Sequence, residues 1–126
     1  MELFFFFCLL VKHATADLFL QTLLKPPHDK LSWLGRGHRH YRDHAVCNFI
    51  VCIFFVSPMW ALLFSILDYI IHWHIDWSKT NIFAYYKIKK DSRTFWKWQT
   101  LDQIAHYATA FLIVYLSTQL DTQVFL

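Results

Sequence analysis

The stretch DYIIHWHIDWSK, residues 68–79, decides how this chain is interpreted. Asp68, His72 and Asp76 recur at every fourth position, so an α-helix would place their side chains on one face. Most of the residues between them are apolar or aromatic. Ionisable groups are costly in such a setting unless they face the interior of a bundle. The stretch therefore predicts a helix that carries a row of polar groups toward other helices.

The same spacing occurs in two further apolar segments, as His13 with Asp17 and as Asp102 with His106. Helices that converge would bring these imidazole and carboxylate groups into one water-poor cavity. Both groups are standard ligands for Zn²⁺, Mn²⁺ and Fe²⁺, and helix bundles build metal sites from such pairs. A further histidine opens the second apolar segment at the same level. The predicted metal ligands are His13, Asp17, His44, His72, Asp76, Asp102 and His106.

This set of residues leaves several interpretations open. Seven ligands exceed the needs of one tetrahedral ion, so two ions fit, as does one ion with carboxylates that orient its histidines. The pairs can also act as hydrogen bonds between helices or as a proton relay. A metal-bound water would make hydrolysis accessible, with Asp68 or Asp17 as the general base.

Nearby polar residues are expected to play smaller parts. His74 lies on another helical face than His72 and is not expected to bind metal. His38 and His40 fall in a basic loop and are expected to face lipid headgroups. Gln21 and Gln103 are expected to hydrogen-bond and orient the ligands Asp17 and Asp102, because they lie close to them in sequence.

Composition indicates one all-α domain, residues 1–126, in a membrane. Hydrophobic residues make up 56% of the chain and aromatic residues 20%, and only two glycines are present. Apolar, aromatic segments of this kind are typical of helices in lipid. We predict a polytopic four-helix transmembrane bundle with helices at about 3–24, 41–56, 59–79 and 96–120, joined by polar connections at 25–40 and 80–95.

Two segments allow an alternative. Ser57 and Pro58 interrupt residues 45–67, which form either one kinked helix or a hairpin of two helices. We favour the hairpin, because one helix from 44 to 76 would be roughly 48 Å long. The first segment resembles a signal peptide around residues 14–16, but Glu2 and Lys12 do not fit that pattern.

The basic residues set the predicted orientation. All of the twelve lysines and arginines except Lys12 fall within residues 25–42 and 79–97. The positive-inside rule places both basic loops in the cytoplasm and both termini outside. The expected partners are the lipid bilayer and another membrane protein or a second copy. No nucleic acid is expected, because the sequence has no binding motif. Cys8, Cys47 and Cys52 lie in apolar segments and are expected to pack rather than form disulfides.

The blocks HATADLFLQ (13–21), His44, HWHIDWSK (72–79) and DQIAH (102–106) together resemble an uncharacterised family. Its members are small multi-pass membrane proteins of bacteria and their phages, known only as a domain of unknown function. The chain is more distantly similar to membrane-bound proteins labelled metal-dependent hydrolases. The resemblance implies a bacterial inner-membrane location and includes Gln103 beside the seven predicted ligands. Thr15 and Ala16 depart from the family, which often has a glycine here.

Three functions follow from these features. The first is a metal-dependent hydrolase with an intramembrane His/Asp site and a membrane-embedded or membrane-proximal substrate. The second is a non-enzymatic, phage-type membrane protein that modulates the host envelope, with the His/Asp pairs as structural contacts. The third is a small ion or proton conductor.

Overall fold

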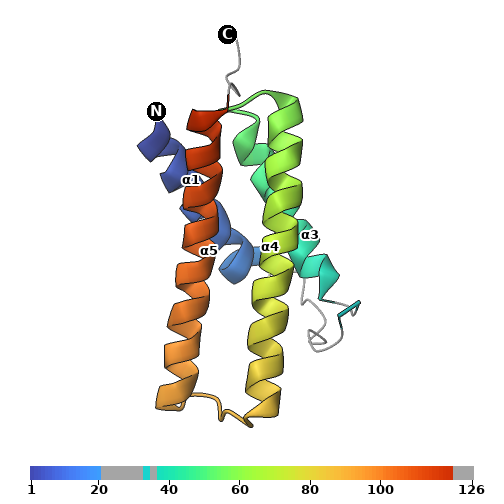
Figure 1. The fold of residues 1–126 in the computed structure, drawn as a ribbon, viewed down its shortest axis with the longest axis vertical. Coiled ribbons are helices and arrows are strands. Elements are labelled where there is room, and N and C mark those ends of the chain that lie inside the picture. Colours follow the sequence, from blue (N-terminus) through green and yellow to red (C-terminus); the bar gives the residue numbers. More distant parts are fainter. Residues whose placement is uncertain (21–32, 35–36, 121–126) are drawn as a thin grey trace.

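The computed structural model describes residues 1–20, 33–34 and 37–120, and within these ranges the chain is helical with no strand. The all-α prediction is therefore confirmed. A single π-helical segment, η1, follows the first helix directly (Figure 1). The elements are α1 (Glu2–Ala14), η1 (Thr15–Leu20), α3 (His38–Cys52), α4 (Pro58–Tyr85) and α5 (Arg93–Gln119).

The four α-helices form a closed bundle. Helix α3 packs on α1 and α4, and α5 packs on α4 and α1, so that each helix has two neighbours. Figure 1 shows α4 and α5 as a long pair whose lower ends extend beyond the shorter α1 and α3. The N-terminus, the turn between α3 and α4, and the last turn of α5 lie at the opposite end. The interior of this bundle is where the polar pairs meet.

Residues 45–67 form a hairpin, as favoured from the sequence. Helix α3 ends at Cys52 and α4 begins at Pro58, where the missing N–H of proline is not needed for a helical hydrogen bond. The preceding Ser57 is extended, with φ −61° and ψ 153°, as proline requires of the residue before it. The break at Ser57 and Pro58 therefore turns the chain rather than kinking one helix.

The polar connection predicted at 80–95 is wrong in extent, because α4 continues to Tyr85 and only residues 86–92 link it to α5. The polar side chains of Thr80 and Asn81 donate back to the carbonyls of Asp76 and Trp77, both at 2.8 Å, so they remain within the helix. The reversal itself uses Lys87 and Asp91, which have positive φ angles of 49° and 63°.

The first helix also differs from its prediction. The α-helical pattern expected over 3–24 changes at Thr15 to the wider π-helix of η1. π-helical turns are rare in proteins, and those that occur often lie at functional sites. The predicted end of this helix at 21–24 lies outside the described residues, as do Gln21, expected to orient Asp17, and the connection at 25–32 and 35–36.

An apolar cluster fills the bundle between the hairpin turn and the polar region. Phe5 stacks on Phe55 with ring centroids 4.4 Å apart. The thiol of Cys52 is fully buried there, which confirms the packing role expected for this cysteine. The buried members of the cluster are Phe5, Leu9, Cys52, Val56, Ala61, Phe64, Ala110, Ile113 and Val114.

Within the ranges given above, no helix is at once long and apolar enough to cross a membrane. The transmembrane part of the predicted fold is therefore not supported by the helices, and the predicted orientation of the basic loops stays a prediction.

Candidate metal centre

Eight buried or half-buried side chains from every helix of the bundle meet at the level of η1. They come in pairs that are four residues apart in the sequence. All seven predicted ligands are among these eight side chains. The eighth is His40. They form three overlapping groups whose ligand atoms lie within 4.8 Å of one another: Asp17, His40, His44 and His72; His13, His72 and His106; and Asp76, Asp102 and His106.

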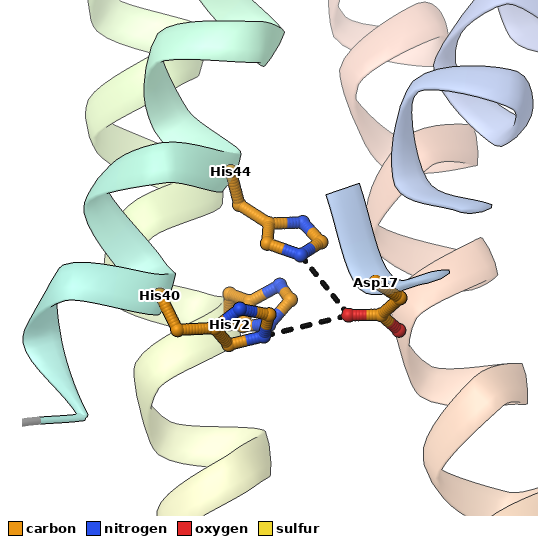
Figure 2. Close-up of side chains that lie close together, drawn as sticks. All are labelled: Asp17, His40, His44 and His72. Atoms are coloured by element: carbon orange, nitrogen blue, oxygen red, sulfur yellow. Dashed lines mark hydrogen bonds and ion pairs between the residues drawn. The ribbon is translucent and has the colours of Figure 1, made fainter. Parts of the chain in front are cut away.

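The first group has the dimensions of a metal site. Figure 2 shows His40 and His44 of α3 and His72 of α4 facing Asp17 of η1. The Nε2 atoms of His44 and His40 lie 3.1 Å and 3.4 Å from Asp17 Oδ1. His40 Nε2 is 3.2 Å from His72 Nε2. Neighbouring ligands around a tetrahedral Zn²⁺ with bonds of about 2.0–2.1 Å are separated by about 3.3 Å, so these spacings fit such an ion.

A second set of ligands lies on the α5 side. His106 Nε2 is 3.5 Å from Asp76 Oδ1 and 3.6 Å from Asp102 Oδ1. The ring of His13 lies beside that of His106, with centroids 4.6 Å apart. The ring of His72 is 4.2 Å from His106 and so connects the two sets.

Two carboxylates stand between these sets and face both. Asp17 presents Oδ1 to His40 and His44, and Oδ2 to His13 Nε2 at 3.2 Å. Asp76 presents Oδ2 to His40 and His72, each at 3.7 Å, and Oδ1 to His106. A carboxylate whose two oxygens face different histidines has the arrangement of a ligand shared by two ions.

Some polar atoms of the cluster have no hydrogen-bond partner in the described part of the chain. His13 Nε2 and Asp102 Oδ1 are both buried in this way and both belong to the second set. The two residues are each only 6% exposed. A buried polar atom without a partner costs about 1–3 kcal/mol. A cation bound beside either atom would provide the missing partner.

The protonation states suit metal binding in the first set. Burial lowers the pKa of His44 to about 4, although Asp17 opposes this, and it lowers the pKa of His72 well below its usual value. Both imidazoles are therefore neutral at pH 7, the form that binds metal. Burial would raise the pKa of Asp17, but its contacts with His13, His40 and His44 outweigh burial and hold that pKa well below the usual range.

In the second set, burial alone would lower the pKa of His106. The contacts of its ring with Asp102 and Asp76 outweigh burial and raise that pKa to about 9. A proton on His106 and a divalent ion are alternative partners for these carboxylates, because both place positive charge at the same point.

Two lysines near the site were not predicted from the sequence. Lys79 Nζ donates to Asp102 Oδ2 at 2.7 Å and lies 4.0 Å from Asp76 Oδ1. Lys12 Nζ donates to Asp68 Oδ2 at 3.0 Å, and both side chains are at most 9% exposed. The Asp68 carboxylate therefore pairs with Lys12 and is not among the three ligand groups, and its role as a general base stays a prediction.

The expectation that His40 faces lipid headgroups is wrong. Helix α3 begins at His38, so His40 and His44 share one face, and His40 is 3% exposed. His38 instead forms hydrogen bonds with Tyr69 Oη at 2.6 Å and the Trp33 carbonyl at 2.9 Å. His74 lies on an exposed face of α4, as predicted.

A cavity of about 420 Å³ adjoins the centre. Asp17, Asp76 and Asp102 of the cluster form part of its wall. Gln103 also lines it and donates from Nε2 to Asp102 Oδ2 at 3.4 Å, the contact expected from the sequence. Further polar lining comes from Lys79, Gln99 and Tyr107.

No family model matches the chain, and neither the curated proteins nor the solved structures contain a match to it. The resemblance to small bacterial and phage membrane proteins stays a prediction based on the sequence blocks.

Proposed function

We propose that the chain binds two divalent metal ions at this centre and acts as a metal-dependent hydrolase. The observation that carries the proposal is the placement of Asp17 and Asp76, whose two oxygens each face different histidines. Helix bundles hold pairs of metal ions with carboxylates and histidines that project inward in this way.

The distances suggest how the ligands divide. One ion would take His40, His44, His72 and Asp17 Oδ1, whose neighbouring atoms are 3.1–3.4 Å apart. Asp76 Oδ2, 3.7 Å from His40 and His72, would be a further ligand of this ion. The other would take His106 with Asp102 and Asp76 Oδ1, at 3.5–3.6 Å, and His13 beside them. Mixed imidazole and carboxylate sites suit Zn²⁺, Mn²⁺ and Fe²⁺.

Such ions supply hydrolytic chemistry, because a divalent cation lowers the pKa of a bound water toward 7. The chain supplies the surroundings that this chemistry needs. Its histidines are held by four packed helices, which fixes their positions, and the adjoining cavity gives a substrate access to the carboxylate side of the centre.

We further propose that the protein associates with a lipid bilayer. Large apolar side chains are exposed on all four α-helices, for example Phe4 of α1, Ile50 of α3, Ile66 of α4 and Phe111 of α5, each at least 47% exposed. Extensive exposed apolar surface marks a site of interaction with a protein or a membrane. Lipid would cover residues on every side of the bundle, whereas one protein partner would cover one face.

The metal proposal is tested by metal content measured by mass spectrometry on protein purified in detergent. We expect close to two Zn²⁺, Mn²⁺ or Fe²⁺ ions per chain. His40→Ala should lose the ion of the first set, because it removes a ligand in contact with both Asp17 and Asp76. His38→Ala is the matched control and should keep both ions. Equal metal content in the two variants, or no metal in the wild type, would contradict the proposal.

The structural alternative also has an observation in its favour, since Lys79 already neutralises one carboxylate of the centre at 2.7 Å. In that case the protein is a non-enzymatic membrane protein of phage type, and its pairs hold the helices together. It predicts no bound metal in any variant and a loss of folding stability in His40→Ala.

Lipid association is tested by flotation with vesicles of neutral and anionic phospholipid. We expect the wild-type chain to float with the vesicles. Ile66→Glu/Ile70→Glu, on exposed positions of α4, should reduce the floated fraction several-fold, because each charge opposes burial in lipid. Ser78→Glu, exposed on the same helix, is the control and should float like the wild type. Equal flotation of both variants would exclude the exposed apolar face of α4 as a lipid-binding surface.

A further inference from the structure

The cavity of about 420 Å³ beside the metal centre combines three carboxylates, one lysine and neutral hydrogen-bond donors. We infer that it binds the phosphate group of a phosphate monoester, with Lys79 and Gln99 as anion-binding residues. This inference rests on the proposed function, because the metal ions complete the site.

The charge of the centre selects an anion once the ions are bound. Asp17, Asp76 and Asp102 with Lys79 leave the site with two negative charges. Two divalent ions reverse this to two positive charges when the histidines are neutral. The nearby pair of Lys12 and Asp68 cancels itself. A phosphate monoester carries close to two negative charges at pH 7, so its charge matches that of the metal-loaded site. A neutral amide or ester would leave the two positive charges of the site uncompensated.

The donors in the cavity suit the oxygens of a phosphate. The Lys79 ammonium has three N–H donors, of which Asp102 Oδ2 takes one at 2.7 Å, so others can turn toward a ligand. Gln99 and Gln103 lie one helical turn apart on α5 and both line the cavity. Their amide groups and the Tyr107 hydroxyl are neutral donors, which bind oxyanions without adding charge.

The rim of the cavity indicates that the alcohol part of the phosphate monoester is apolar. Leu18 and Tyr107 line the cavity and are 73% and 43% exposed. A phosphate held at the carboxylate side would leave its organic part against these two side chains. In hydrolysis, the oxygen of water would bond to phosphorus and the bond from phosphorus to the ester oxygen would break. The alcohol oxygen would keep the electron pair and take up a proton.

The test measures phosphate binding by isothermal titration calorimetry to protein loaded with Zn²⁺, with metal content determined on the same sample. The probes are inorganic phosphate, glycerol 3-phosphate and a short-chain phosphatidic acid. Lys79→Met should weaken the binding of all three by about 10-fold or more, because a hydrogen bond to a charged group is lost. Lys97→Met, exposed on α5 and outside the cavity, is the control and should bind like the wild type.

A second pair of variants keeps the Lys79 contact with Asp102 intact. Gln99→Glu places a negative charge in the cavity and should also weaken phosphate binding about 10-fold or more. Thr100→Glu places the same charge one residue further on, at an exposed position, and should have little effect. Tighter binding of the phosphatidic acid than of glycerol 3-phosphate would support the inference with a lipid as the alcohol, and equal binding would support it with a soluble one.

The outcomes separate the two proposals. Stoichiometric metal without measurable phosphate binding would overturn the inference and leave the metal centre in place. Phosphate binding that Lys79→Met and Gln99→Glu do not weaken would also overturn it, because the anion would then bind elsewhere. A chain that takes up no metal would overturn the proposed function and this inference with it.

Discussion

Asp76→Asn is expected to remove most of the bound metal while the helices stay folded. The substitution keeps the shape of the side chain but removes its charge and one of its two carboxylate oxygens. Asp76 faces His40 and His72 with Oδ2 and His106 with Oδ1, so both proposed ions lose a ligand. Changes to outer-shell residues already cost metal sites about 10–100-fold in affinity. A shared ligand should therefore cost at least about 100-fold.

Two measurements check this result. Metal content after dialysis at fixed free Zn²⁺ should fall well below the wild-type value. Thermal unfolding should show the linked effect, because Zn²⁺ at about 100 times its dissociation constant adds about 2.7 kcal/mol to the stability of the wild-type chain. The variant should melt at the same temperature with and without Zn²⁺. Hydrolytic activity, once a substrate is found, should disappear in parallel.

Asp43→Asn is the matched control for Asp76→Asn. Asp43 is half-buried on α3 and pairs with Arg42 at 2.9 Å, away from the cluster. Its change should leave metal content and the response to Zn²⁺ unaltered. If Asp76→Asn keeps two ions, Asp76 is not a shared ligand and the proposed division of the site fails. If only the metal-free stability falls, the residue acts as a structural contact.

The candidate ligands were predictable because their signal is local. Two groups four residues apart share a helical face whatever the rest of the fold does, so His13 with Asp17 and Asp102 with His106 could be identified from sequence alone. His40 gives the same signal with His44. It was missed because the helix was expected to begin at Tyr41, after a loop rich in glycine and basic residues, whereas α3 begins at His38.

Features that depend on contacts between helices could not be predicted. Lys79 and Asp102 are 23 positions apart, and Lys12 and Asp68 are 56 apart, so no sequence period links them. The π-helix that carries Asp17 was not predicted from the sequence either. The prediction of membrane spans rested on composition, on apolar segments and on the placement of the basic residues. The ionisable groups that form the site interrupt the same apolar segments, and the helices consequently lack the uninterrupted apolarity of a span.

Lys12→Met is expected to destabilise the fold by about 3–5 kcal/mol, the range for removing one partner of a buried ion pair. The Lys12 and Asp68 side chains are 5% and 9% exposed and join α1 to α4 with a contact of 3.0 Å. Without the lysine, the Asp68 carboxylate stays buried with an uncompensated charge. Urea unfolding of metal-free protein, followed by circular dichroism, should show the loss. Arg42→Met breaks an exposed pair and should cost no more than about 1 kcal/mol.

The double variant Lys12→Met/Asp68→Leu distinguishes the effect of the buried charge on stability from the effect of side-chain packing. Replacing both partners by apolar side chains leaves no charge buried, so most of the lost stability should return. The pair also has a positional role, since Lys12 adjoins His13 and Asp68 lies one turn before His72. The double variant should therefore fold stably. It should still bind metal more weakly than the wild type, because the position of α1 along α4 is less strictly fixed without the ion pair. Wild-type metal affinity in this variant would contradict that role. A loss of stability in Lys12→Met no larger than in Arg42→Met would contradict the burial of the pair.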